Sequence, residues 1–287
     1  MAMKDSMVID GSDITFGLLE ELFKQLKSGA KDPSKGLTGV HIRALLEHRN
    51  PFDRKELEKV LPNADEETES NYCYPDGFHF RTVDEQVETL LKHFPNLDAS
   101  HVQELASGEF PEGAEGWAVI PKSDKIGTYH DALAKALELL VKGQKFQNWI
   151  EGKLTERHLR LKEKTAQAHA KLNEQPGDFW VFPFQFSKKW RGHSVQDAQV
   201  VRFAESEFGL GPYEAAILML THPDRITGPN QLYIDCAGCE YRPAADGDFF
   251  ACPDFRWGSY YERLELYYSR TDDVYERWGA VSGFRAQ

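Results

Sequence analysis

Apolar residues are most concentrated in the segment 179–236, where strand-like and helix-like spacings alternate. The aromatic and β-branched start of this segment has the length of a buried strand, and a polar, basic stretch follows it. Serine is a preferred helix N-cap, and proline is favoured in the first turn of a helix. The pattern therefore predicts a strand at 179–186, a helix from Ser194 to Phe208, a helix at 212–222 and a strand at 231–236.

Helical spacing dominates the first part of the chain. Apolar residues recur at helical intervals within 14–26 and 40–45. Thr82 and Glu85 have the spacing of a capping box, which opens a helical hairpin. We therefore expect a helical region over residues 1–112. A DNA-reading helix-turn-helix is the less favoured interpretation of the first two helices, because their linker is long and their surroundings are acidic.

A strand, a helix and a long connecting helix are predicted for residues 113–175. The strand is the apolar pentapeptide at 117–121, and a capping box opens the helix behind it. From Leu154 to Leu172 no glycine or proline interrupts a run of good helix formers. High intrinsic propensity over such a length favours one continuous helix.

The last region, 176–287, becomes rich in strand signals toward its end. Two apolar runs, 249–257 and 261–269, are joined at Gly258 and Ser259, which predicts a β-hairpin. A short final helix is expected near Asp272, followed by a peripheral tail. The fold class is therefore α+β, in which a helical N-terminal part precedes a mixed β-sheet part flanked by helices.

Composition narrows the classes of protein that this chain can represent. In 287 residues, 34 lysines and arginines stand against 46 aspartates and glutamates, and the resulting net charge of −12 disfavours nucleic acid and anionic membranes as partners. No run of about 18 apolar residues and no secretory signal pattern is present. Four cysteines suit a reducing compartment better than a disulfide framework. We expect a soluble, cytoplasmic protein.

A metal site is one candidate for the chemistry of this chain. Cys236 and Cys239 have the two-residue spacing with which one turn presents two thiolates to zinc. Cys252 begins a stretch that resembles the second knuckle of a zinc ribbon, although a ribbon has its fourth cysteine where this chain has Phe255. A neighbouring aspartate, Cys73 or a histidine would have to complete the site. The alternative is that these are small buried cysteines without metal, and no other cofactor is expected.

An anion site is the second candidate. If the three apolar strands predicted before residue 240 lie parallel, their carboxyl ends gather on one rim of a sheet, where α/β sheets bind ligands. The rim would carry a basic loop followed by a helix N-terminus, which favours phosphate or carboxylate. The alternative is that the basic side chains only keep the surface soluble. The residues predicted to bind the anion are Lys188, Lys189, Arg191, His193 and Asp235.

No complete set of catalytic residues can be assembled from the sequence. We therefore favour a binding or interaction protein whose partner is a small anionic ligand or another protein. The alternative is a small-molecule enzyme of hydrolase or transferase type, with Cys236 as nucleophile or a metal at the carboxyl edge of the sheet. His193 or His222 would then act as the base.

Overall fold

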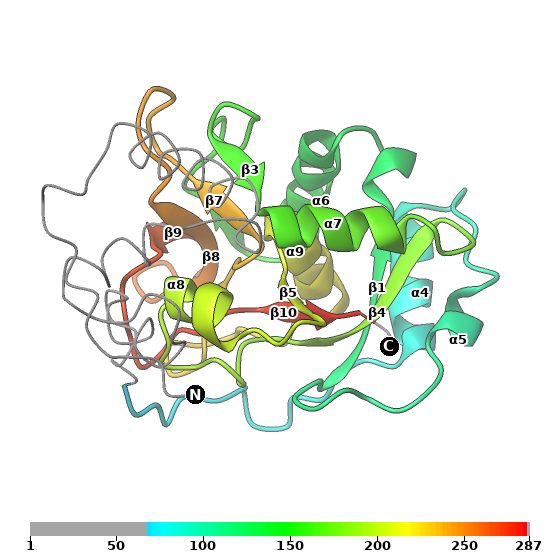
Figure 1. Cartoon of the computed structure of the whole chain (residues 1–287), viewed down its shortest axis with the longest axis horizontal. Helices are drawn as coiled ribbons and strands as arrows, with labels where there is room; N and C mark the ends of the chain where they lie inside the picture. The colour runs from blue at the N-terminus through cyan, green and yellow to red at the C-terminus, as the bar shows by residue number, and fades with distance from the viewer. Residues whose placement is uncertain (1–67, 286–287) are drawn as a thin grey trace, which may run out of the picture. The chain divides into compact units, whose positions relative to one another are not determined.

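The computed structural model describes residues 68–285, which belong to one compact unit, Glu66–Gln287 (Figure 1). Helices and two separate β-sheets build this unit, so the predicted α+β class is confirmed. The two helices predicted within 14–26 and 40–45 lie outside the described residues. Within the described chain, no helix is long and apolar enough to cross a membrane.

The first sheet has four strands, and all of its neighbouring pairs are antiparallel. Their order is β1-β4-β10-β5, so the last described strand lies between two earlier ones (Figure 1). The expectation of parallel strands at 117–121 and 179–186 is therefore wrong, as is that of a peripheral tail. These strands are β1 (Gly116–Pro121), β4 (Phe179–Gln185), β5 (Glu207–Gly209) and β10 (Ser282–Phe284).

The second sheet has six strands and is mixed, because β2 pairs with β9 in parallel and the other pairs are antiparallel. The predicted hairpin is confirmed: β8 and β9 pair along their whole length, with Phe255 opposite Leu266. The strand predicted at 231–236 is reduced to two residues that pair with β8. The strands are β2 (Phe146–Asn148), β3 (Leu159–Leu161), β6 (Ile234–Asp235), β7 (Cys239–Tyr241), β8 (Ala251–Gly258) and β9 (Arg263–Arg270).

Helices pack around the four-stranded sheet. Both predicted capping boxes are present, at Thr82 before α4 and at Thr128 before α6. Every residue of α9 is buried, which explains why its sequence is apolar on all sides, and this helix packs against α6, α4 and β1. The helices are α4 (Val83–His93), α5 (Val102–Leu105), η2 (Ser123–Lys125), α6 (Tyr129–Gly143), α7 (Glu163–Leu172) and α9 (Pro212–Thr221).

The continuous helix predicted from Leu154 to Leu172 is wrong. The chain forms strand β3 first, and α7 begins only at Glu163. Leu159 lies opposite Tyr241 of β7 in the second sheet and is almost fully buried there. A tertiary pairing with a strand far along the chain therefore overrides the local helix propensity of this segment.

The helix predicted from Ser194 to Phe208 is also much shorter than expected. Ser194 does cap it, because its hydroxyl accepts a hydrogen bond from the Asp197 N–H at 3.0 Å. The chain then forms α8 (Val195–Asp197) and a π-helical segment, η3 (Ala198–Arg202), before it becomes extended. Phe208 belongs to β5, where its ring packs 5.5 Å from that of Phe182. Pairing with β10 thus turns an apparent helical position into a strand position.

The final helix predicted near Asp272 is absent from the described chain, whose segment 271–279 has no helix.

Candidate functional site

The predicted basic loop follows β4, and its second lysine is already used inside the fold. The Lys189 ammonium lies 2.7 Å from Oε2 of Glu207, a carboxylate with no exposed surface. The other oxygen of Glu207 accepts hydrogen bonds from Trp190 Nε1 at 2.7 Å and from the Ser282 hydroxyl at 2.6 Å. Lys189 therefore neutralises a buried charge that joins β5 and β10 to this loop.

Two further residues of the loop also contact the fold. Arg191 donates a hydrogen bond to the Tyr72 carbonyl oxygen at 3.2 Å. His193 is buried, and its Nδ1 lies 2.8 Å from Oδ2 of Asp197. Lys188 is exposed. The loop as an anion site stays a prediction, and an anion would have to replace the present partners of Lys189, Arg191 and His193.

The three cysteines predicted to bind zinc are all buried. The Cys239 thiol donates a hydrogen bond to the Cys236 carbonyl oxygen at 3.3 Å. Burial raises the pKa of each of the three thiols well above its ordinary value, which favours the protonated form over a metal-binding thiolate. Among residues 68–285, no group of three or more His, Cys, Asp or Glu is arranged to hold a metal ion. The described geometry therefore gives a zinc site no support.

Asp235, the last predicted binding residue, lies directly opposite Asp254 in the register of β6 and β8. Burial, and then the charge of Asp254, raises the pKa of Asp235 well above its usual range. Burial likewise raises the pKa of Asp254 to about 6. Oδ1 of each residue is buried without a hydrogen-bond partner. Facing carboxylates, each with one oxygen that lacks a donor, destabilise each other when both are charged, so the pair retains a proton more readily than isolated aspartates do.

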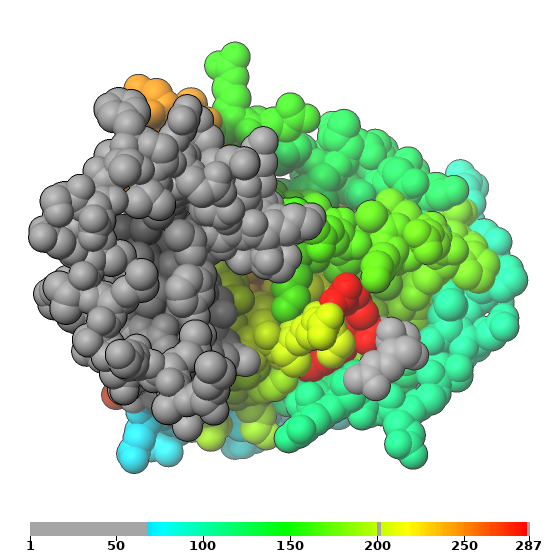
Figure 2. Space-filling view, viewed as in Figure 1, coloured from blue at the N-terminus to red at the C-terminus, as the bar shows by residue number. Residues whose placement is uncertain are grey.

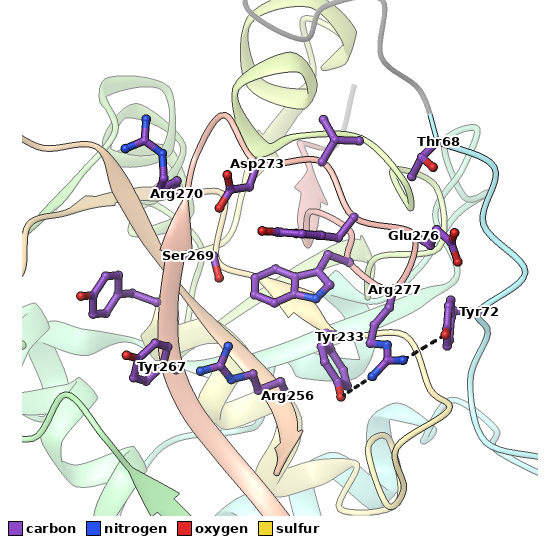
Figure 3. Close-up of a pocket in the computed structure, with 14 residues that line it drawn as sticks. Thr68, Tyr72, Tyr233, Arg256, Tyr267, Ser269, Arg270, Asp273, Glu276 and Arg277 are labelled. Carbon is purple, nitrogen blue, oxygen red and sulfur yellow. Dashed lines mark hydrogen bonds between the residues drawn. The ribbon is translucent and has the colours of Figure 1, made fainter. Parts of the chain in front are cut away.

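An open pocket of about 900 Å³ lies along the β8–β9 hairpin (Figure 3). Its lining comes from both strands of the hairpin, from the segment that leads from β9 toward β10, and from the chain near Tyr72 and Tyr233. The volume is within the range of about 300–1,000 Å³ that is usual for small-molecule sites. We call it the aromatic pocket, because six lining side chains are aromatic: Tyr72, Tyr233, Tyr267, Tyr268, Tyr275 and Trp278.

Arg277 is the cation on one side of the aromatic pocket. Its guanidinium group donates hydrogen bonds to the hydroxyl oxygens of Tyr72 at 3.0 Å and of Tyr233 at 3.3 Å (Figure 3). Within the described chain no carboxylate pairs with it. A guanidinium group has five N–H donors, so two bonds to neutral phenols leave both its charge and part of its donor capacity for a ligand.

Arg256 is the second cation of the aromatic pocket. Its guanidinium group lies over the Tyr267 ring at 4.1 Å, which holds the side chain against β9. Its Nε is 3.7 Å from Oδ1 of Asp254, too far for a hydrogen bond. The other oxygen of Asp254 accepts a hydrogen bond at 3.0 Å from Ser269, which also lines the pocket. Asp254 is therefore connected to the pocket through Arg256 and Ser269.

Among the other hollows in the described chain, two are closest to the aromatic pocket in volume. One, of about 720 Å³, lies between α6 and the segment 146–155. Figure 2 shows the face that carries the other, which is lined by Arg285, segment 204–206 and the end of α7. This second hollow measures about 670 Å³. The aromatic pocket combines several aromatic rings with two arginines that have no carboxylate at hydrogen-bonding distance. Neither of the other two hollows has this combination.

The sequence interpretation missed the aromatic pocket because its lining is assembled from distant segments. One local signal was present: Tyr267 and Ser269 are two residues apart on a predicted strand, so they share a face of it. A second was the mixture of charged and aromatic residues at 272–278, which we expected to begin a short helix. Tyr72 and Tyr233 could not have been added, since they approach only when the chain folds.

The fold and the site define an α+β protein with two β-sheets and an open, aromatic, arginine-containing pocket. No protein-family model, curated protein or solved structure matches the chain.

Proposed function

We propose that the protein binds a small ligand with an anionic group in the aromatic pocket. The observation that carries the proposal is Arg277, a cation at the pocket wall whose two hydrogen bonds go to the neutral hydroxyl groups of Tyr72 and Tyr233. An arginine without a carboxylate partner is suited to receive carboxylate or phosphate, because its planar donors match two oxygen atoms of either group.

The aromatic rings support a ligand that has a flat or apolar part as well. The Trp278 ring lies 6.0 Å from that of Tyr233 and 5.4 Å from that of Tyr275. Tyrosine and tryptophan provide large contact areas with few rotatable bonds, so little conformational entropy is lost when a ligand packs on them. This proposal keeps the small anionic ligand expected from the sequence and moves its principal site from the loop to the pocket.

The position of Cys236, the suggested nucleophile, does not support the alternative that the protein is an enzyme. Cys236 is fully buried, and burial raises the pKa of its thiol, so neither access nor ionisation favours attack on a substrate.

We also propose that the protein is located in the cytoplasm. This location is supported by the four cysteines, which are all unpaired, as is usual in a reducing compartment.

The experiment is a titration of the protein with benzoate, a flat anion, followed by calorimetry and tryptophan fluorescence. We expect saturable binding to the wild type and a loss of about tenfold or more in affinity for Arg277→Gln, since one hydrogen bond to a charged group contributes about 1.5–3 kcal/mol. Arg256→Gln tests the second cation separately.

Arg160→Gln is the matched control, because Arg160 is an exposed arginine outside the pocket that pairs with Glu240. Its affinity for benzoate should equal that of the wild type. Absence of saturable binding, or equal affinity of the Arg277→Gln variant and the wild type, would overturn the proposal.

A further inference from the structure

We infer that the aromatic pocket binds its anion together with a proton, and that Asp254 takes up this proton. Asp254 is then a positioning residue for the charge of Arg256. When Asp254 is charged it attracts the Arg256 guanidinium group, and when it is protonated it leaves that positive charge to the ligand. This inference rests on the proposed function and adds its regulation by pH.

Arg256 contacts Asp254 and also lines the pocket. Its side chain is partly exposed there, as is that of Ser269 beside it (Figure 3), whereas Asp254 has no exposed surface. Nε of Arg256 is 3.7 Å from Oδ1 of Asp254, which is close enough for an ion pair but too far for a hydrogen bond. An anion that binds Arg256 from the pocket therefore competes with Asp254 for the same positive charge.

Asp254 has few hydrogen-bond donors to stabilise its charge. In the described chain only Oδ2 accepts a hydrogen bond, from the Ser269 hydroxyl at 3.0 Å, and Oδ1 is buried without a partner. Asp235, directly opposite on β6, also has a buried oxygen without a partner. A buried carboxylate in such surroundings is costly when it is charged, and burial raises the pKa of Asp254 to about 6.

The charges around Asp254 show which group a ligand would influence. After burial, Arg256 and the Ser269 hydroxyl act to lower the pKa of Asp254, and Glu265 on β9 acts to raise it. Within residues 68–285, Arg256 is the cation among the groups that act on the two aspartates. The other titratable groups beside the pair are acids, thiols or a phenol: Asp273, Cys236, Cys252 and Tyr267.

The direction of the pH dependence follows from this shared cation. In the free protein Arg256 helps Asp254 to stay charged. A bound anion offsets the charge of Arg256, so the pKa of Asp254 becomes higher in the complex than in the free protein. The complex then binds more protons than the free protein does. The affinity for the anion is therefore highest at low pH and falls as the pH rises through about 6.

Calorimetric titration with benzoate between pH 5.5 and 8 tests this inference. We expect the wild type to bind benzoate about fivefold more tightly at pH 5.5 than at pH 8, because a nearby opposite charge changes the pKa of a carboxyl group by about 1–3. Incomplete ionisation of benzoate at pH 5.5 would weaken binding, so it cannot produce this trend. Titrations in two buffers with different ionisation enthalpies should show that about half a proton is taken up per benzoate near pH 6.5.

Variants distinguish the positioning role of Asp254 from a merely structural one. Asp254→Asn should bind benzoate at pH 8 as tightly as the wild type does at pH 5.5, because asparagine leaves the charge of Arg256 to the ligand at every pH. Arg256→Gln should bind benzoate weakly and also lose the pH dependence. Arg277→Gln should bind more weakly at every pH and keep the pH dependence. Asp248→Asn, at an exposed aspartate outside the pocket, is the control and should match the wild type.

The outcomes separate this inference from the proposed function. If benzoate binds in an Arg277-dependent way with the same affinity from pH 5.5 to 8, the anion site stands and the uptake of a proton is excluded. If the affinity of Asp254→Asn falls with pH as that of the wild type does, another group takes up the proton and the role of Asp254 is wrong. If benzoate binds at none of these pH values, both proposals fail.

Discussion

The side chains of Asp235 and Asp254 face each other across β6 and β8, and Oδ1 of each is buried without a hydrogen-bond donor. The Ser269 hydroxyl and, at 3.7 Å, the Arg256 guanidinium group are the neighbours that moderate the charge of Asp254. Asp235 has no such neighbour at hydrogen-bonding distance on its carboxylate within the described residues. Two facing carboxyl groups in this environment make the stability of the fold depend on pH.

The first prediction is that Asp254→Asn stabilises the protein near pH 7.5. Burial raises the pKa of Asp254 to about 6 in the folded chain, whereas an unfolded aspartate has a pKa of about 3.9. Between these values the folded state binds more protons, so the wild type loses stability as pH rises from about 4 to 6 and stays at that lower level above it. Asparagine does not titrate, and its amide group can donate to Asp235.

Urea denaturation at pH 4, 5, 6 and 7.5 measures this difference. The free energy of unfolding of Asp254→Asn should exceed that of the wild type by on the order of 1–3 kcal/mol at pH 7.5, and this difference should decrease toward pH 4. Asp248→Asn, at an exposed position, should behave like the wild type at every pH. A gain that is the same at pH 4 and 7.5 would contradict the assigned protonation.

The second prediction concerns Lys189 and its ion pair with the buried Glu207. Lys189→Met should lower the free energy of unfolding by about 1–3 kcal/mol, because it leaves a buried carboxylate without its cation. The double variant Lys189→Met/Glu207→Gln should recover part of the loss, since glutamine can still accept from Trp190 and Ser282.

Thermal and urea unfolding of the two variants, with Lys188→Met as an exposed control, decide this point. The control should unfold like the wild type. Equal stability of Lys188→Met and Lys189→Met would show that the ion pair has no structural role. Lys189 would then be available to bind an anion, as predicted from the sequence.

The third prediction is that one of the four thiols reacts rapidly with a thiol reagent at pH 8. Cys73 is exposed, whereas Cys236, Cys239 and Cys252 are buried and have raised pKa values. The three buried thiols should react only as the protein unfolds, and Cys73→Ser should remove the rapid phase. Rapid labelling of all four would contradict the burial, and about one equivalent of bound zinc per chain would contradict the protonated thiols.

Local signals in the sequence predicted most of the helix starts and the β8–β9 hairpin. A capping box such as Thr82 with Glu85 involves residues that are close in the chain, so its energetics can be read from the spacing alone. The strand at Leu159 could not be predicted in this way, because its stability comes from pairing with Tyr241. The antiparallel direction of β1 and β4 could not be predicted either, because it also depends on pairing between segments that are distant in the chain.

The candidate site was predicted only in fragments. Asp235 was singled out as a residue at the end of a strand, but it is buried opposite a second aspartate and does not line the aromatic pocket. The basic loop was recognised by composition, which does not reveal that Lys189 has Glu207 as its partner. Charge patterns locate cations along the chain, whereas the availability of each cation depends on contacts between distant segments.

The position of β10 has a consequence for the order in which the first sheet becomes complete during synthesis. β4 and β5 are both made well before β10, yet in the first sheet β5 pairs only with β10. Until residues 282–284 emerge, β4 and β5 each present an unpaired strand edge, which is a template for pairing with other chains. The nascent protein thus passes through a stage with two open edges, and this stage ends when the last strand inserts between them.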